Sequence, residues 1–280
     1  MVVKLVTDSV SDLPPEVAKE MDITVVPLNV HFGTETYKDG VELSTEEFYH
    51  KLDNSPVSPT TSAPAPGLFA EAFDRLAEKT NEILAVIVAQ KLSATYDAAL
   101  QGMKLMKKKC QVEVVDSTLG IMGEGLLLVE LAKRALAGIS LHELVTMTAK
   151  ITPRIHNRIT LDTLKYMAKG GRIGKAQALL GSVLKINPVI GIKDGEILPF
   201  AKMRSREKAR EWMYEFAANF SRVKALAVEC GTNMGEAKAL AERIASVWPK
   251  VPIYMSKVSP VVGAHTGPGV LSVSVLEQGD

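Results

Sequence analysis

The chain has 280 residues, 46% of them hydrophobic, with 33 Lys and Arg against 32 Asp and Glu. This length allows one large domain or two modest ones, with enough apolar side chains to bury real cores. A net charge of +1 provides no excess of positive charge to hold a phosphate backbone, so we expect no nucleic-acid partner. The two cysteines, Cys110 and Cys230, form no C-x-x-C pair, which indicates a reducing compartment, by default the cytoplasm.

No segment predicts export or membrane insertion. The first residues, MVVKLVTDS, reach Asp8 before a signal-peptide core could form. The longest stretch without Asp, Glu, Lys or Arg runs from Val258 to Leu276, but Pro260, Pro268 and several glycines interrupt it. It cannot be a continuous spanning helix, and we expect a soluble protein without stable membrane insertion.

In the first half of the chain, strand patterns and helix patterns alternate. The expected strands cover residues 2–6, 23–32, 83–90 and 111–117, and the expected helices cover residues 14–21, 45–52, 67–79, 95–109 and 122–138. Such alternation predicts a mainly parallel sheet with helices on both faces. We therefore expect an α/β domain over residues 1–155.

The pattern changes in the second half. Residues 161–184 predict a helix, a Gly-rich turn and another helix, and Asp194-Gly195 marks a hairpin. A helix near 205–219, a strand at 224–230, a helix at 234–248 and strands near 252–257 and 270–276 follow. We expect an α+β domain over residues 156–280 with a mixed or antiparallel sheet, and so a two-domain α/β protein.

Familiar catalytic and cofactor motifs are absent from the sequence. KGGRIGKA fails as a phosphate loop, because Lys169 stands where Gly is required and Ala176 where Ser or Thr is required. There is no G-x-G-x-x-G fingerprint, no zinc spacing among the five histidines and no G-x-S-x-G elbow. We expect neither cofactor nor metal, and the fold class alone indicates no function.

Three polar segments are candidates for a ligand site. SPTTSAPAPG, residues 58–67, is either a linker or a stiff loop that aims hydroxyls at a ligand. Ser93, in KLSATYDAA, either caps the next helix or faces a ligand. His265, in GAHTGPG, is expected to be accessible, and it either pins its loop or contacts a ligand.

These three segments are expected at or near strand ends, where open α/β sheets place their ligand crevices. Their side chains also have compatible chemistry. Hydroxyls and an imidazole can hold a carboxylate through hydrogen bonds without a formal ion pair. The three segments together could therefore hold the carboxylate of a ligand.

The motifs TDSVSDLP, PTTSAP, LSATY, LKYMAKGGRIG, KMRSREKA and GAHTGPG, in this order, resemble the DegV family over nearly the whole chain. The resemblance implies two α/β-type domains with a long-chain fatty acid between them, its carboxylate near the surface and its tail in the core. It further implies that a separate fatty acid kinase receives the carboxylate and makes acyl-phosphate for phospholipid synthesis.

Carried over by position, the resemblance implies that Thr61 and Ser93 bind the carboxylate and that His265 completes the head-group network, with Ser62 a weaker candidate. It also places basic residues around the cavity mouth, toward the partner kinase and its phosphates: Arg172, Arg204 and Arg206. The alternative for at least one of these arginines is an ordinary solvated surface position.

Two positions depart from the family pattern. Ala63 stands where many members have Gln, and Ala94 where many have Gly, so the head-group network or the loop conformation differs here. The resulting hypothesis is a lipid-binding subunit without catalytic residues of its own. Two alternatives stay open: an acyl hydrolase with Ser93 as nucleophile and His265 as base, and a lipid sensor or scaffold without a kinase partner.

Overall fold

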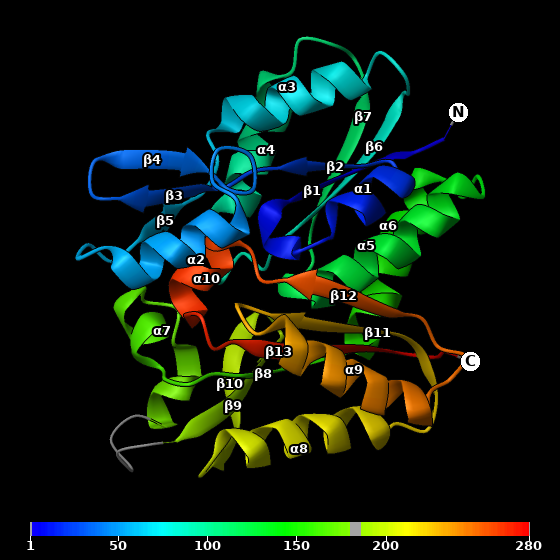
Figure 1. Cartoon of the computed structure of the whole chain (residues 1–280). Coiled ribbons are helices and arrows are strands. Elements are labelled where there is room, and N and C mark those ends of the chain that lie inside the picture. The colour runs from blue at the N-terminus through cyan, green and yellow to red at the C-terminus, as the bar shows by residue number, and fades with distance from the viewer. Residues whose placement is uncertain (1, 180–185, 280) are drawn as a thin grey trace.

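A computed structural model describes residues 2–179 and 186–279. The molecule has two stacked halves, each built on its own sheet (Figure 1). The sheet of the first half is parallel throughout and confirms the prediction. Its order is β2-β1-β6-β7, formed by β2 (Ile23–Val26), β1 (Lys4–Asp8), β6 (Glu82–Ile87) and β7 (Gln111–Asp116).

Helices cover both faces of this parallel sheet, as the alternating pattern predicts. Apolar side chains of α3 (Pro66–Leu76) and α4 (Thr95–Leu105) pack against one face. Those of α5 (Ile121–Leu136) and α6 (Leu141–Ile151) pack against the other. The short helix α1 (Pro15–Glu20) begins with proline, whose fixed φ suits the first turn.

The prediction of one strand over residues 23–32 is wrong. Pro27 separates β2 from β3 (Asn29–Phe32), because proline has no N–H to continue a ladder. β3 instead belongs to a small antiparallel sheet of order β4-β3-β5, with β4 (Glu35–Lys38) and β5 (Thr60–Ser62) at its edges. The Pro-rich stretch therefore contains a short edge strand. The preceding helix, α2 (Thr45–Asn54), begins with a capping box formed by Ser44 and Glu47.

The sheet of the second half has the order β10-β9-β8-β13-β11-β12 and is antiparallel except where β11 pairs with β12. The predicted hairpin is confirmed, since Asp194 and Gly195 both adopt positive φ between β9 and β10. The strands are β8 (Ile155–Thr160), β9 (Asn187–Lys193), β10 (Glu196–Met203), β11 (Val223–Cys230), β12 (Ile253–Lys257) and β13 (Leu271–Glu277). Helices α8 (Arg206–Ala218) and α9 (Met234–Val247) cover one face.

Short helical segments complete the chain. They are α7 (Lys165–Lys169), α10 (Pro260–Thr266) and three 3-10 turns, η1 (Ser9–Ser11), η2 (Thr152–Arg154) and η3 (Gly174–Leu179). The second helix that we predicted within residues 161–184 is a 3-10 segment as far as Leu179, and its remainder lies outside the described residues.

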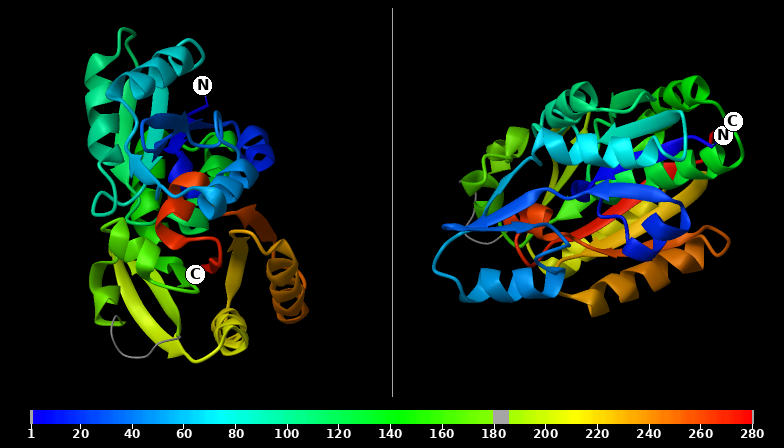
Figure 2. Two further views of the ribbon diagram at one scale, coloured as in Figure 1. Left: turned by 60° about the vertical axis from the view of Figure 1, so that its left-hand side comes forward. Right: turned by 90° about the horizontal axis from the view of Figure 1, so that it is seen from above.

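Helix α5 joins the two halves. One continuous apolar cluster contains Leu5 and Leu84 of the first sheet, Leu127 of α5, and Ala227 and Leu276 of the second sheet. The views in Figure 2 show α10 lying between the two halves. Among the described residues, no helix is both long and apolar enough to cross a membrane. The division at residue 155, at the start of β8, stays our proposal for the domain boundary.

Candidate functional site

A cavity of about 340 Å³ lies between the two halves. Its walls are mostly aliphatic and come from the six-stranded sheet, the small sheet, α5, α10 and the segment after β6, with Ile121, Ile159, Ile190, Ile192 and Val258 among them. Ile121 adopts φ of 51°, in the left-handed region that a β-branched residue rarely enters. A mostly apolar cavity of this kind suits a hydrophobic ligand.

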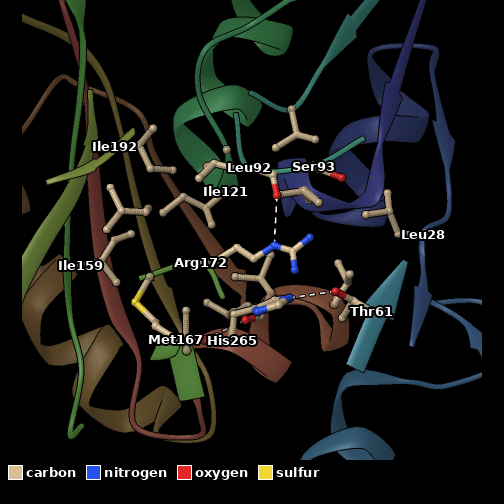
Figure 3. A pocket seen from close by; sticks show the side chains of 18 of the residues that line it. Leu28, Thr61, Leu92, Ser93, Ile121, Ile159, Met167, Arg172, Ile192 and His265 are labelled. Carbon is tan, nitrogen blue, oxygen red and sulfur yellow. Dashed lines mark hydrogen bonds between the residues drawn. The ribbon is translucent and has the colours of Figure 1, made fainter. Parts of the chain in front are cut away.

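Polar side chains gather at one end of this cavity. We call the group of Thr61, Ser93, Arg172 and His265 the polar end. Figure 3 shows the Arg172 side chain extending between Ser93 and His265, while Ile159 and Ile192 lie on the other side of the cavity. The cavity therefore has an apolar body and one polar end, contributed by four separate segments of the chain.

His265 projects from the last turn of α10 and contacts Thr61 of β5. The distance between His265 Nε2 and Thr61 Oγ1 is 2.8 Å. Burial, together with the nearby charge of Arg172, lowers the pKa of His265 to about 4. The imidazole is therefore neutral at pH 7.

The second ring nitrogen of His265 is unused. Nδ1 is buried and has no hydrogen-bond partner among the described residues. If the ring proton is on Nε2, it is donated to Thr61 Oγ1, and the Thr61 hydroxyl hydrogen is then free to bind a ligand oxygen. The pair therefore keeps hydrogen-bonding capacity for a ligand.

The turn after α7 positions the His265 ring. A Cβ on Gly170 would lie 2.1 Å from His265 Nδ1, so only glycine permits this approach. The sequence analysis noted the Gly-Gly pair in LKYMAKGGRIG but assigned it no role at the site. The available signal was a glycine pair directly after a predicted helix.

Arg172 follows this turn and joins it to the Ser93 segment. Its Nη1 donates to the Gly170 carbonyl at 2.9 Å, and its Nε donates to the Leu92 carbonyl at 3.2 Å. These bonds hold the guanidinium at the polar end and bring residues from both halves of the molecule together. A fixed cation beside neutral hydrogen-bonding groups suits an anionic head group.

Ser93 lies in the turn between β6 and α4. Its Oγ is 2.8 Å from Thr95 Oγ1 and accepts a hydrogen bond from the Thr95 N–H at 3.3 Å. The N-cap position of α4 is occupied by Ala94, without a side-chain cap bond. Ser93 is therefore not the N-cap residue of α4, and it lines the cavity.

Ser62 is turned away from its neighbour Thr61. Successive side chains of a strand point to opposite faces, and on the face opposite Thr61 the Ser62 hydroxyl contacts His31 Nε2 at 3.0 Å and Asn29 Nδ2 at 3.2 Å. Ser62 borders the cavity, but its hydroxyl is engaged within the small sheet. The structure thus separates two hydroxyls that are adjacent in sequence.

The other two candidate arginines do not line the cavity. Arg206 binds Glu236 through Nε and Nη2 at 2.9 and 2.6 Å, and its Nη1 donates to the Gly269 carbonyl at 2.7 Å. It holds the segment that follows α10. Arg204 is exposed. Contact of these two arginines with a partner protein stays a prediction.

The expectation of an accessible His265 on a tight loop needs correction. The GAHT part of GAHTGPG is helical, and the glycine turn begins only at Gly267, with φ of 77°. His265 is partly buried because Gly170 and Thr61 pack around its ring. The glycines and proline of the motif mark the end of a helix, which the sequence analysis did not assign.

Buried carboxyl groups hold the other end of α10. Asp12 Oδ1 accepts from the Ser259 N–H at 3.1 Å, and Asp39 Oδ1 accepts from the Val261 N–H at 3.2 Å. Burial raises the pKa of Asp39 to about 7, and it raises the pKa of Asp12 well above its usual range. Neither residue was predicted from the sequence. Within the described residues, no cluster of three or more His, Cys, Asp and Glu side chains is arranged to hold a metal ion.

Known proteins share this architecture. The family model described as "Uncharacterised protein, DegV family COG1307" matches residues 2–278. DegV domain-containing proteins of Halalkalibacterium halodurans and Streptomyces coelicolor are 35% and 36% identical to the chain. The matches cover 97% of both chains in the first case and 98% of both in the second.

Solved structures agree with this match. A protein from Bacillus subtilis, described as DegV, a fatty acid binding protein, superposes with a TM-score of 0.91 at 26% identity, over 99% of this chain and all of that one. A DegV family protein from Thermus thermophilus, described by its fatty acid binding, gives 0.89 at 27% identity, with the same coverage. The fold, the full-length match to the family model and the similarity to relatives lead to one conclusion: this chain belongs to the DegV family.

Proposed function

We propose that this protein binds a long-chain fatty acid in the cavity between its halves, with the carboxylate at the polar end and the tail along the aliphatic walls. The observation that carries this proposal is the asymmetry of the cavity, which has Thr61, Ser93, Arg172 and His265 at one end and mostly aliphatic side chains elsewhere. Structures of similar proteins described as fatty acid binding support the same ligand class.

The two parts of such a ligand contribute differently. Each buried methylene contributes about 0.8 kcal/mol, so the tail supplies most of the affinity. The carboxylate loses its hydration on entry, and this cost is offset only by hydrogen bonds and a nearby cation. Arg172 provides the cation, while the hydroxyls of Thr61 and Ser93 provide donors. The head group therefore sets the orientation of the ligand.

We further propose that the bound carboxylate is presented to a separate fatty acid kinase. Beside the polar end lies a surface recess of about 560 Å³ that shares Ser93 and Arg172 with the cavity. Lys91 and Lys175 border this recess, and both pair with Glu196. Such a recess offers a partner access to the carboxylate. Because this chain has no phosphate loop, the phosphoryl transfer is assigned to the partner, and the cytoplasm is the expected compartment.

The geometry gives no support to the hydrolase alternative. A serine nucleophile needs a base within hydrogen-bond reach and a third group that orients the base. Here Ser93 Oγ contacts Thr95, whereas His265 Nε2 contacts Thr61. His265 Nδ1 has no carboxylate partner among the described residues. Ser93 and His265 therefore do not form a catalytic pair in this arrangement.

Two measurements test the proposal in order. Denaturing mass spectrometry of an organic extract should find one fatty acid per chain, and a lipid-free protein that also fails to take up added palmitate would overturn it. The loaded protein, mixed with a fatty acid kinase and ATP, should then yield acyl-phosphate. Stoichiometric lipid without kinase-dependent product would instead identify a lipid sensor or scaffold.

A further inference from the structure

A second cavity, of about 630 Å³, lies on another part of the interface between the two halves. It is lined by the connection between β7 and α5, by the last turns of α6, and by strands β8, β9 and β10. Ile192 is the one described residue that borders both cavities, and none of the polar-end residues lines the second one. The side chains that line the second cavity are therefore different from those of the polar end.

Arg158 of β8 is the notable group in this cavity. Its Nη1 donates to the Asn157 carbonyl at 2.6 Å, and its Nε is buried without a partner among the described residues. No carboxylate of residues 2–179 and 186–279 lies within 4.0 Å of its guanidinium. Burial lowers the pKa of Arg158 to about 10, which still leaves it charged at pH 7.

The fold fixes this guanidinium in place. The ladder between β8 and β9 pairs Ile159 with Ile190 and Thr160 with Val189, and Arg158 lies just beyond its end. Next to this point lies Gly191, where a Cβ would lie 2.6 Å from the Asn157 carbonyl oxygen and 3.0 Å from the Phe200 ring. Phe200 therefore reaches Arg158 across β9, with its ring centroid 3.5 Å from the guanidinium carbon, and Phe216 of α8 lies at 4.7 Å.

These contacts compensate only part of the cost of burial. Desolvation of a cation without a counter-ion is unfavourable even for a half-buried side chain such as Arg158, and cation–π contacts offset only part of it. The guanidinium also offers five donors in a rigid fork, suited to a carboxylate or phosphate. A preorganised, partly desolvated arginine without a counter-ion, beside an open volume, is the arrangement expected of an oxyanion site.

From this arrangement we infer that the second cavity binds a small oxyanion, a carboxylate or a phosphate, with Arg158 as its principal ligand. Lys193 lies on the exposed rim and adds positive charge. Two acids also line the cavity. Asp116 accepts from the Thr118 and Gln90 N–H groups at 2.8 and 3.2 Å, and Asp194 is exposed at the hairpin. The walls include Val115, Leu119 and Val145, which favour an organic anion over a free ion.

The test uses the full chain, loaded with palmitate so that the polar end is occupied. Inorganic phosphate and then acetate are titrated into the ¹⁵N-labelled protein at constant ionic strength, while the Arg Nε–Hε signals are followed by NMR. The Arg158 signal should shift along a saturating curve. The matched control is Arg243, which also stacks on an aromatic ring, that of Tyr214, but is paired with Glu211.

Saturation by either probe at Arg158 but not at Arg243 supports the site, and the tighter probe identifies the ligand class. The absence of a shift, a linear shift, or an equal shift at Arg243 overturns it.

Arg158→Met should weaken the affinity for the tighter probe at least tenfold in calorimetry, which equals about 1.4 kcal/mol. If the Met variant does not fold, Arg158→Lys is measured instead. This variant keeps the charge but loses the fork of donors, and it should weaken binding of the probe severalfold. Unchanged affinity in the Lys variant would also overturn the proposal. Fatty acid content is a separate readout, so this inference and the proposed function fail independently.

Discussion

The two ends of α10 lie in different polar surroundings. At its beginning, the carboxyl groups of Asp12 and Asp39 accept backbone N–H groups in a buried setting. At its last turn, the neutral His265 lies near the cation of Arg172. An anionic ligand is attracted to the second end, where Arg172 supplies a positive charge. One short helix thus both anchors the two halves to each other and gives the cavity a direction.

The buried acids make the first end sensitive to pH. Burial raises the pKa of Asp8 to about 6 and the pKa values of Asp39 and Glu229 to about 7. A raised carboxyl pKa means that the folded state binds the proton more tightly than the unfolded state. The resulting stability is complete below about pH 4, the ordinary range of these groups, and it is lost as pH rises through 6 to 7.

We therefore expect the largest effect in the free energy of unfolding, which should fall between pH 4 and pH 8. One pKa unit corresponds to about 1.4 kcal/mol, so the loss from Asp39 alone is on the order of 4 kcal/mol. Denaturant unfolding at several pH values measures it. Asp39→Asn keeps an oxygen for the Val261 N–H and removes the titration, so its curve should be flatter. A stability that rises from pH 5 to pH 8 would contradict this account.

The next largest effect is a difference in palmitate affinity between variants of two adjacent glycines, Gly170 and Gly171, beside the polar end. Gly170→Ala places a Cβ against His265 Nδ1 and should displace the ring, lowering palmitate affinity at least tenfold. Gly171→Ala meets open space but keeps a φ of 70°. It should cost about 1 kcal/mol of stability through backbone strain and leave palmitate affinity unchanged. Equal losses of affinity in both variants would show that the position of the His265 ring does not determine palmitate affinity.

A bound carboxylate should change the titration of His265. The lipid-free protein should give a His265 pKa of about 4, and palmitate should raise it, because a nearby anion favours the imidazolium. A carboxylate within about 4–6 Å typically shifts a pKa by about 1–3 units. NMR titration of the imidazole with and without palmitate measures this change. An unchanged pKa would place the carboxylate away from His265.

The smallest effect distinguishes two neighbouring hydroxyls. Thr61→Val removes a hydroxyl at the polar end and should weaken palmitate binding by about 1 kcal/mol, or roughly fivefold. Ser62→Ala removes a hydroxyl that faces His31 and Asn29, and it should leave palmitate affinity unchanged. Calorimetry with both variants compares the two faces of β5. A larger loss in Ser62→Ala would reverse our assignment of the faces.

The alternating strand and helix patterns predicted the parallel sheet, and the Asp194-Gly195 pair predicted the hairpin of the second sheet, because both depend on local periodicity and turn chemistry. Pro27 was also a local signal, which indicates a break in the predicted strand over residues 23–32. The placement of β3 after this break could not be predicted, because it depends on where the small sheet lies. Helix α10 was missed because GAHTGPG is rich in turn residues, whereas its helical start is fixed by Asp12 and Asp39, more than 200 residues away in sequence.

The candidate site was predictable in part. Hydroxyl and imidazole residues were recognised from their motifs, and the structure brings Thr61, Ser93 and His265 together with Arg172. The direction of each side chain was not predictable, because the opposite orientations of Thr61 and Ser62 follow from the pairing of β5 with β3. Nor could local sequence show that Arg206 is engaged by Glu236, since that contact joins α8 to α9.

The most direct test of the central claim is carboxyl ¹³C NMR of the protein loaded with palmitate labelled at its carboxyl carbon. We predict one bound resonance, distinct from free palmitate, that moves in Thr61→Val and in Arg172→Gln but not in Ser62→Ala. A bound resonance that is identical in all these variants would contradict the account, because the carboxylate would then lie outside the polar end.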